Sequence, residues 1–541
     1  MTCALSALFL NFIISAVSSL WFRKHEPHIF TFLAVCLVIA CVHAAHHIAL
    51  AEAGFARVMT FVSCQLTIYL VFLSLLTLEY RLSSRHPLAR FPGPAMAKVS
   101  KWYMAYHVLV GTRHAILQRL HAQFGPWVRI GPNELSINDA DAVKPIYLNL
   151  PRAASYKAVP ARDQTLIMIV DRQQHTQRRK PWTRAFSSKM LAKYAVAASN
   201  RARQLAAILQ GRSLIDLNHW LALCLMDIIG DLGFSGGIEA LAAGEDRADW
   251  MNMLNLGALV VGVLGQVPWL TDFVLLFPQN GPLETFHKFA RDKVESARAK
   301  ALSEDANILS IILNDNVNAS SQSSLSTGEA AADASLLMAS SIETTSQALT
   351  TLFRYVLTDD SILGRLRAEI AAAFPDGDED INVTYRDAHK TVFLNACIQE
   401  ALRIMPPAPA GLPRSSGAHG VTIIGEFIPP ETTVHVPTFT LQRTAANFAE
   451  PDRFIPTRWL PSERNSTPHN ELAYIPFGAG FGACVGRQLA LQNIRILAIH
   501  LLSKLDIKLS TGLSLNNFDA SHKDRGLWTH DKFLVDVEKR L

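Results

Sequence analysis

A single cysteine near the end of the chain is surrounded by glycines. The stretch PFGAGFGACVGRQLAL, residues 476–491, holds Cys484 together with Gly478, Gly480, Gly482 and Gly486. A cysteine with a purely structural role is usually buried among apolar side chains, whereas glycine leaves the backbone uncovered. The composition therefore indicates that a bulky group approaches the backbone on both sides of the thiol.

Glu400 and Arg403 carry opposite charges three residues apart, so they share one face of a predicted helix. An isolated pair at this spacing is usually a solvated surface pair. The flanking segment FLNACIQEALRIMPPAP, residues 393–409, is strongly apolar and favours burial instead. Because buried charges need partners, the pair indicates a structural ion network.

Glu343 and Thr344 lie in a predicted helix over about 333–358, directly after the apolar run ASLLMASSI at residues 334–342. An acid beside a hydroxyl could relay protons, and the hydroxyl could bond to a helix carbonyl or to water. The alternative is a polar patch on an exposed helix, which the preceding apolar run disfavours.

Four motifs in this order and spacing together resemble the cytochrome P450 family. They are ETTSQAL from Glu343, EALR from Glu400, FIPTRW at residues 454–459 and the glycine-rich stretch around Cys484. The resemblance runs from about residue 85 to the C-terminus. The last motif fits the haem-binding signature of the family at Phe477, Gly480, Cys484, Gly486 and Ala490.

The resemblance implies a P450 fold that binds haem b, with Cys484 as the thiolate ligand of the iron and Phe477, Gly480 and Gly486 around the cofactor. A thiolate ligand favours O–O bond cleavage. The glycines would let the loop lie flat under the macrocycle, and the helix that follows would point its positive end at the sulfur. Arg458 would join the pair of Glu400 and Arg403 in a buried network.

Glu343 and Thr344 match the catalytic acid–alcohol pair of the family, although Ser340 and Ser341 stand where the family usually has Ala-Gly. A sharper departure is Gly482, which replaces an arginine that pairs with a haem propionate. Compensating cations are expected, and the candidates are His175, Arg179 and Arg414. The basic run 178–184 could instead form a docking patch for an acidic redox partner.

The implied function is an NADPH- and O2-dependent monooxygenase that receives electrons from a separate NADPH-cytochrome P450 reductase and acts on a lipophilic small molecule. The chain looks like fungal microsomal members, many of which tailor terpenoids and polyketides in secondary-metabolite biosynthesis. Three alternatives are open. They are isomerase or dehydratase chemistry within the family, a non-enzymatic haem-binding membrane protein, and a nicotinamide enzyme that reads Gly478, Gly480 and Ala483 as a dinucleotide fingerprint.

Composition narrows the class of protein. The 541 residues include 49% hydrophobic residues, and the net charge is only +5, which does not indicate a nucleic-acid partner. The seven cysteines form no CxxC pair, so neither a disulfide framework nor a structural zinc site is expected.

Three apolar stretches at about 4–22, 29–50 and 56–78 each approach the length that crosses a bilayer. A cleaved signal peptide is the alternative for the first. Basic residues after the first and third stretches place the rest of the chain in the cytosol, which predicts a multi-pass protein of the endoplasmic reticulum membrane. The apolar segment 253–277 either dips into the bilayer or is a core helix.

The elements that must position these residues give a mainly α fold with small β-sheets. The expected organisation is a membrane anchor at 1–80, a Pro-rich spacer at 81–99 and a catalytic domain at 100–541. Within the domain, the patterns predict a helix at 113–125 capped by Gly125, a hairpin at 127–139 and strands at 420–439. Helices are expected over 186–230 and 285–313, with a Ser-rich linker at 318–332 between them and the next helix.

Overall fold

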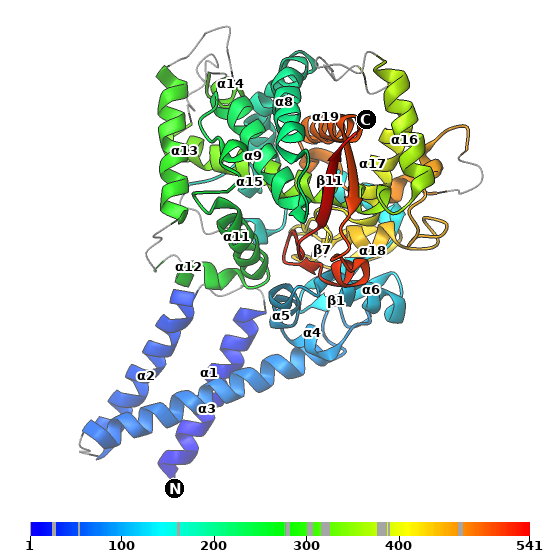
Figure 1. Ribbon diagram of the computed structural model, residues 1–541. Coiled ribbons are helices and arrows are strands. Elements are labelled where there is room, and N and C mark those ends of the chain that lie inside the picture. Colours follow the sequence, from blue (N-terminus) through cyan, green and yellow to red (C-terminus); the bar gives the residue numbers. More distant parts are fainter. Residues whose placement is uncertain are drawn as a thin grey trace.

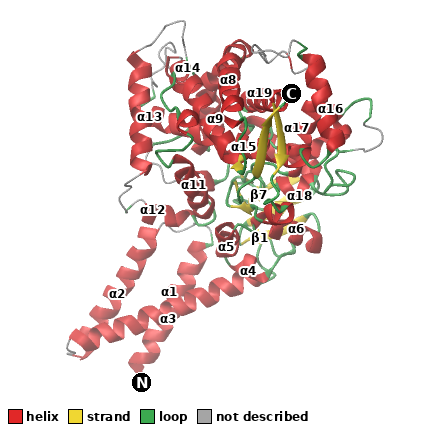
Figure 2. Cartoon of the chain, in the orientation of Figure 1, coloured by secondary structure: helices red, strands yellow, loops and turns green. Residues whose placement is uncertain are grey.

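The computed structural model describes residues 2–23, 29–51, 55–158, 163–274, 276, 282–299, 307–314, 325–375, 387, 390–463 and 469–540. These residues form a helix-rich domain with a bundle of long N-terminal helices beside it (Figure 1). Small strands occur only in short sheets among the described residues (Figure 2). The expectation of a mainly α fold with small sheets is confirmed.

The N-terminal helices are α1 (Thr2–Phe22), α2 (Ile29–Ala51) and α3 (Phe55–Leu82). Most of their large apolar side chains face outward, as in a bundle that lies in lipid. Between the helices, Asn11 Nδ2 donates to Gln65 Oε1 at 2.6 Å, and His43 Nε2 donates to Asn11 Oδ1 at 2.9 Å. One residue from each helix therefore joins a buried polar triad.

The third helix extends beyond the predicted apolar stretch and reaches the domain. It ends at Leu82, and the short helix α4 (Ala95–Val99) follows the proline-containing segment. Arg81 Nη1 donates to the carbonyl oxygen of Val99 at 2.6 Å, and Arg129 Nη1 donates to that of Arg81 at 3.1 Å. These contacts fasten the end of α3 to the first sheet of the domain.

The helices of the domain continue the chain order. They are α5 (Trp102–Val110), α6 (Arg113–Phe124), α7 (Arg172–Ala185), α8 (Ser188–Leu209), α9 (Leu217–Phe234), α10 (Ala240–Ala243), α11 (Trp250–Leu264), α12 (Thr271–Val274), α13 (Pro282–Ala299), α14 (Ile308–Asn314), α15 (Thr327–Val356), α16 (Asp360–Ala373), α17 (Val392–Ile404), α18 (Thr438–Gln442), α19 (Arg487–Lys504) and α20 (Leu515–Ala520). The predicted end of α6 at Gly125 is confirmed by that residue's positive φ of 88°.

Four small sheets lie beside the helices. The first has the order β1-β2-β7-β4, in which the predicted hairpin of β1 (Trp127–Gly131) and β2 (Glu134–Ile137) pairs with β7 (Thr433–His435), which in turn pairs with β4 (Arg414–Ser415). The others are β3 (Ile215–Asp216) with β11 (Leu534–Lys539) and β8 (Leu505–Leu509), β5 (Val421–Ile423) with β6 (Glu426–Ile428), and β9 (Lys523–Asp524) with β10 (Trp528–Thr529).

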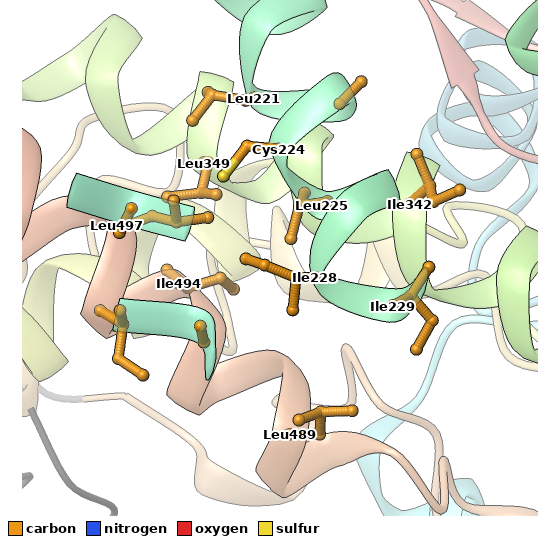
Figure 3. Close-up of a cluster of buried hydrophobic side chains, with 14 of the residues drawn as sticks. Leu221, Cys224, Leu225, Ile228, Ile229, Ile342, Leu349, Leu489, Ile494 and Leu497 are labelled. Carbon is orange, nitrogen blue, oxygen red and sulfur yellow. The ribbon is translucent and has the colours of Figure 1, made fainter. Parts of the chain in front are cut away.

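The core is built around α9, α15 and α19. Leu221, Leu225 and Ile228 of α9 pack with Leu349 of α15 and Leu497 of α19, all of them buried (Figure 3). By length and composition α9 could span a membrane, but 83% of its apolar window is buried inside the protein. It is therefore a core helix, and it holds α15 in place next to the functional site.

The Ser-rich segment is shorter than predicted on its C-terminal side. Helix α15 already begins at Thr327, because Ser326 accepts from the backbone N–H of Glu329 and the Glu329 side chain accepts from that of Ser326. This reciprocal capping box stabilises the first turn. Residues 318–324 of the predicted linker lie outside the described residues.

Candidate functional site

The loop before α19 holds Cys484 in a tight backbone arrangement. The backbone N–H of Cys484 donates to the carbonyl oxygen of Phe477 at 2.9 Å, and that of Ala483 donates to Gly480 at 3.1 Å. Gly480 has a φ of +67°, and a β-carbon there would lie 2.0 Å from the carbonyl oxygen of Tyr147. Only glycine fits this position, which explains part of the glycine pattern around the thiol.

Opposing influences act on the Cys484 thiol. Burial raises the pKa of the thiol above its ordinary value, and the backbone N–H groups of Gly486 and Arg487 and the charges of Arg179 and Arg487 offset only part of that rise. Gly486 is the N-cap of α19, so these amides are the unpaired donors at a helix start. The expectation that this helix directs its positive end at the sulfur agrees with this arrangement. The thiol itself is accessible.

Arg179 lies next to the cysteine loop. Its Nη1 donates to the carbonyl oxygen of Ala483 at 2.6 Å and to that of Phe481 at 3.4 Å. The guanidinium therefore braces the loop from α7 and adds positive charge beside Cys484. The sequence pointed to Arg179 as a propionate ligand, and its remaining donors leave that prediction open.

Arg414 is fully buried, yet none of its three guanidinium nitrogens has a hydrogen-bond partner among the described residues. The guanidinium carbon lies 4.6 Å from the ring centroid of Phe481 and 5.4 Å from that of Tyr147. A buried cation without an anion is costly. This arrangement therefore suits an anionic ligand that binds beside Phe481.

His175, on α7, is like Arg414 a buried group whose polar atoms have no hydrogen-bond partner among the described residues. It is 1% exposed, and neither ring nitrogen has a partner among the described residues. Burial and the nearby charges of Arg152, Arg179 and Arg414 lower its pKa to about 4, so the ring is neutral at pH 7. Its centroid lies 5.7 Å from that of Phe481. A neutral imidazole can still donate one hydrogen bond to a carboxylate.

These residues fit the haem that the resemblance implies. An accessible thiol with amide and cation support suits an iron ligand, and the orphaned donors of Arg414 and His175 suit the carboxylates of propionates. Phe477 packs at the edge of the core, under Arg487. Among the residues that the structure describes, no cluster of three or more His, Cys, Asp and Glu could hold a metal ion by itself.

Arg178 does not take part in a docking patch, which was the alternative interpretation of the basic run 178–184. Its Nη2 donates to Asp333 at 2.9 Å, and its Nη1 donates to Glu329 at 3.2 Å. Asp333 also accepts from the backbone N–H of Leu166 at 2.9 Å. Arg178 thus ties the segment before α7 to α15, so it does not belong to a surface patch. Sequence reasoning missed Asp333, since an isolated aspartate in an apolar helix has no local signature.

The predicted buried network of Glu400 is confirmed. Arg403 and Arg458 donate to Glu400 at 2.8 Å and 3.1 Å, and all three side chains are 0% exposed. Trp459 Nε1 donates to the second oxygen at 2.8 Å, and the backbone N–H of Ile455 completes the set at 2.9 Å. With every carboxylate oxygen bonded, the network joins α17 to the segment that leads to the cysteine loop.

Glu343 and Thr344 lie near the middle of α15. Thr344 Oγ1 donates to the carbonyl oxygen of Ser340 at 2.7 Å, as its helical position allows. The Glu343 carboxylate has no hydrogen bond or ion pair with any described residue, and burial raises its pKa to about 7. Ser341 bonds to the carbonyl oxygen of Leu337 at 2.7 Å, so both serines before Thr344 satisfy themselves within the helix.

Arg152 is a functional-site residue that the sequence did not indicate. Its Nη1 donates to the carbonyl oxygens of Leu166, Ile167 and Ile169 at 2.9–3.1 Å, and its backbone forms a β-bridge with Arg414. It therefore shapes the wall beside Arg414. No motif surrounds it, because its partners are backbone carbonyls that any sequence supplies.

Comparison with known proteins agrees with this geometry. The family model described as Cytochrome P450 matches residues 94–534. A protein named cytochrome P450 monooxygenase FCK2 from Fusarium pseudograminearum is 30% identical over 475 residues, covering 86% of this chain and 85% of that protein. Cytochrome P450 monooxygenase phqL from Penicillium fellutanum is 29% identical over 434 residues, covering 79% and 75%.

A third relative extends the similarity to the N-terminal helices. Cytochrome P450 67 from Uromyces fabae is 26% identical over 559 aligned positions, and the match covers 97% of each chain. The similarity is thus not confined to the residues around Cys484.

Proposed function

Because this chain belongs to the cytochrome P450 family, we propose that it is a membrane-anchored haem-thiolate monooxygenase that inserts one oxygen atom of O2 into a lipophilic small molecule. Membership makes it an oxidoreductase with haem iron as its implied cofactor. The single observation that carries the proposal is the exposed Cys484 in the glycine-rich loop, whose sulfur lies beside the backbone amides of Gly486 and Arg487 and the charge of Arg179.

In this proposal, Cys484 is the iron ligand, and Phe477, Gly480 and Gly486 shape the loop beneath the cofactor. Arg414 and His175 hold the propionates, since their buried donors have no other partner among the described residues. Arg179 contributes a further cation next to the cysteine loop. The bound haem supplies the redox chemistry that activates O2.

Glu343 and Thr344 serve as the proton-handling pair. A general acid works best when its pKa lies near the working pH, and burial raises the pKa of Glu343 to about 7. Near neutrality the carboxyl can therefore both give up and regain a proton. Thr344 holds its hydroxyl against the Ser340 carbonyl, which fixes the orientation of its oxygen.

NADPH would supply the electrons through a separate NADPH-cytochrome P450 reductase. The exposed cations Arg172, Lys180 and Arg184 on α7 offer a docking surface for an acidic partner. They lie on the helix that also carries Arg179 next to the cysteine loop.

An apolar surface beside the anchor supports membrane residence of the domain and a lipophilic substrate. On α5, Trp102 is 49% and Tyr106 59% exposed, and on α11 Leu256 is 61% exposed. The ring centroids of Trp102 and Trp269 are 6.3 Å apart, so α5 also contacts the segment that follows α11. Exposed apolar patches of this kind mark membrane contact. We place the domain on the cytosolic face of the endoplasmic reticulum, behind three spans.

The relatives support a class of substrate for this proposal. Several are fungal proteins named cytochrome P450 monooxygenases, and the role that fits them and the apolar surface is oxidation in secondary-metabolite biosynthesis. Terpenoid and polyketide precursors are therefore the first compounds to test.

A carbon monoxide difference spectrum of the reduced protein tests the haem-thiolate centre. The band of a thiolate-ligated haem is expected in the wild type and should vanish in Cys484→Ala. Cys41→Ser, an exposed cysteine of the anchor, is the matched control and should keep the band. An unchanged chromophore in Cys484→Ala would refute the assignment.

Product analysis then tests the reaction. With reductase, NADPH and 18O2, one labelled oxygen atom should appear in the product. Turnover that continues without NADPH would instead establish isomerase or dehydratase chemistry. A bound haem with no turnover of any compound in the panel would favour a non-enzymatic haem protein.

A further inference from the structure

A small polar cavity lies on one side of Glu343. Its volume is about 70 Å³, and it is partly open. Besides Glu343, its polar lining residues are Asn218, Asn255, Gln347, Thr529 and His530. They come from the start of α9, from α11, from α15 and from the C-terminal hairpin of β9 and β10. A polar cavity of this size has space for about two water molecules.

The Glu343 carboxyl needs those waters. It is half-buried and has no hydrogen bond or ion pair with any described residue. Buried polar groups in folded proteins almost always have a partner, either protein or ordered water. The cavity is therefore the place where the carboxyl is hydrated.

The other lining side chains have free donors and acceptors for a short water chain. Thr350 Oγ1 donates to Asn218 Oδ1 at 2.9 Å, which leaves the Asn218 NH2 group to donate into the cavity. Gln347 Nε2 is 3.3 Å from Thr351 Oγ1 and 3.5 Å from His522 Nε2, which leaves the Gln347 Oε1 as an acceptor. Donors and acceptors thus flank the carboxyl on its own helix and on α9.

The C-terminal hairpin contributes His530 to the lining of the cavity. His530 Nδ1 donates to the carbonyl oxygen of Asp531 at 2.6 Å, so its Nε2 is an acceptor. His522 lies 5.0 Å from His530 between ring centroids, and its Nδ1 is held by the carbonyl oxygen of Phe518 at 3.1 Å. Both rings are neutral at pH 7, because burial lowers the pKa of His522 to about 4 and also lowers that of His530. Neutral rings do not repel protons.

The charged groups around the cavity are few. Asp216 and Asp531 act on His530, and Asp519 acts on His522. Helix α11 carries no charged residue. None of these groups forms an ion pair with Glu343 among the described residues, so water in the cavity is the polar partner that the site has room for.

We infer that this cavity is the proton inlet of the enzyme, in which Asn218, Gln347 and His530 are positioning residues that hold the waters through which Glu343 is reprotonated from solvent. The inference rests on the proposed role of Glu343. The Glu343 carboxyl gives one proton toward Thr344 and becomes a carboxylate. One proton then returns from bulk solvent along the waters, and no electron moves in either step.

Carboxyl infrared spectroscopy of the full-length resting holoenzyme tests this without turnover. The C=O band that disappears in Glu343→Gln identifies the carboxyl, and its shift after transfer to D2O gives the exchange rate. Asn218→Leu and Gln347→Leu should slow that exchange by about tenfold or more, since apolar side chains cannot bond the waters. Asn255→Leu should act in the same direction. Asn252→Leu, exposed on the same helix, is the matched control and should leave the rate unchanged.

A second readout uses the coupling of electrons to product. Asn218→Leu and Gln347→Leu should raise the share of NADPH electrons lost as hydrogen peroxide and enlarge the solvent isotope effect, and Glu343→Gln should do the same. If Glu343→Gln changes the coupling and the cavity variants change neither coupling nor exchange, the inlet is refuted while the proposed function stands. If Glu343→Gln leaves coupling unaltered, the role of Glu343 itself fails. Weaker substrate binding in the cavity variants with normal exchange would make the cavity a substrate subsite and overturn the inference.

Discussion

Arg414 occupies the space in front of Gly482. A β-carbon added to Gly482 would lie 2.4 Å from Arg414 Nη2 and 3.3 Å from its guanidinium carbon. The position two residues before Cys484, where the family usually has an arginine, is thus filled by an arginine from β4. Arg414 therefore supplies a cation to the region around Gly482, although it comes from a different segment of the chain.

The first prediction concerns Arg414, which takes the place of the arginine that the family usually has at position 482. Gly482→Arg should displace Arg414 and place two guanidinium groups together, which repel each other. Haem release to a scavenging globin should become several-fold faster, and the double variant Gly482→Arg with Arg414→Ala should restore a rate near that of the wild type. Gly364→Arg is the control, because a β-carbon at this α16 glycine meets nothing within 4 Å. Equal rates of haem release in all variants would contradict the idea that Arg414 replaces an arginine at position 482.

The second prediction is a pH-dependent stability. Burial raises the pKa of Glu343 to about 7 from 4.5, so the folded state binds more protons than the unfolded state between these values. The contribution of Glu343 to the free energy of unfolding therefore falls as the pH rises from 4.5 to 7. Glu343→Gln should match the wild type at pH 4 and exceed it by about 1 to 3 kcal/mol at pH 8. Denaturant unfolding in detergent measures this difference, and a flat difference curve would refute it.

The third prediction tests the buried network. Glu400→Gln removes the anion shared by Arg403 and Arg458 and leaves two buried cations uncompensated. It should lower the free energy of unfolding by about 3–5 kcal/mol and reduce the yield of haem-loaded protein. Glu463→Gln breaks the exposed pair with Arg365 and should cost less than about 1 kcal/mol. Comparable losses of unfolding free energy in the two variants would contradict the prediction that the buried network stabilises the fold more than an exposed ion pair does.

The fourth prediction concerns the anchor. Asn11→Leu removes the residue that bonds both His43 and Gln65 between the N-terminal helices. Such interhelical hydrogen bonds stabilise membrane helices by about 1 kcal/mol, so amide exchange in α1 and α3 should accelerate about fivefold in micelles. Thr60→Val is the control, since this exposed hydroxyl bonds only within its own helix at 2.9 Å. Unchanged exchange in Asn11→Leu would show that the three helices associate without the triad.

Local patterns in the sequence were enough for most helices and for the core of the site. The apolar residues of α19, the glycines beside Cys484 and the three-residue spacing of Glu400 and Arg403 are each local features of the chain. Backbone geometry and helix periodicity act over a few residues, so such features can be read directly. The start of α15 was misplaced because the capping box at Ser326 lies inside a polar stretch that looked like a linker.

The partners of the charged groups were decided by the tertiary structure. Arg178 and Asp333 are 155 residues apart, Arg414 and Gly482 come from separate segments, and the cavity at Glu343 is closed by His530 near the C-terminus. Whether a buried charge is paired, free for a ligand or shifted in pKa depends on groups within a few ångströms. The chain order carries no record of those distances, and only the packing of α9, α11, α15 and the C-terminal hairpin creates them.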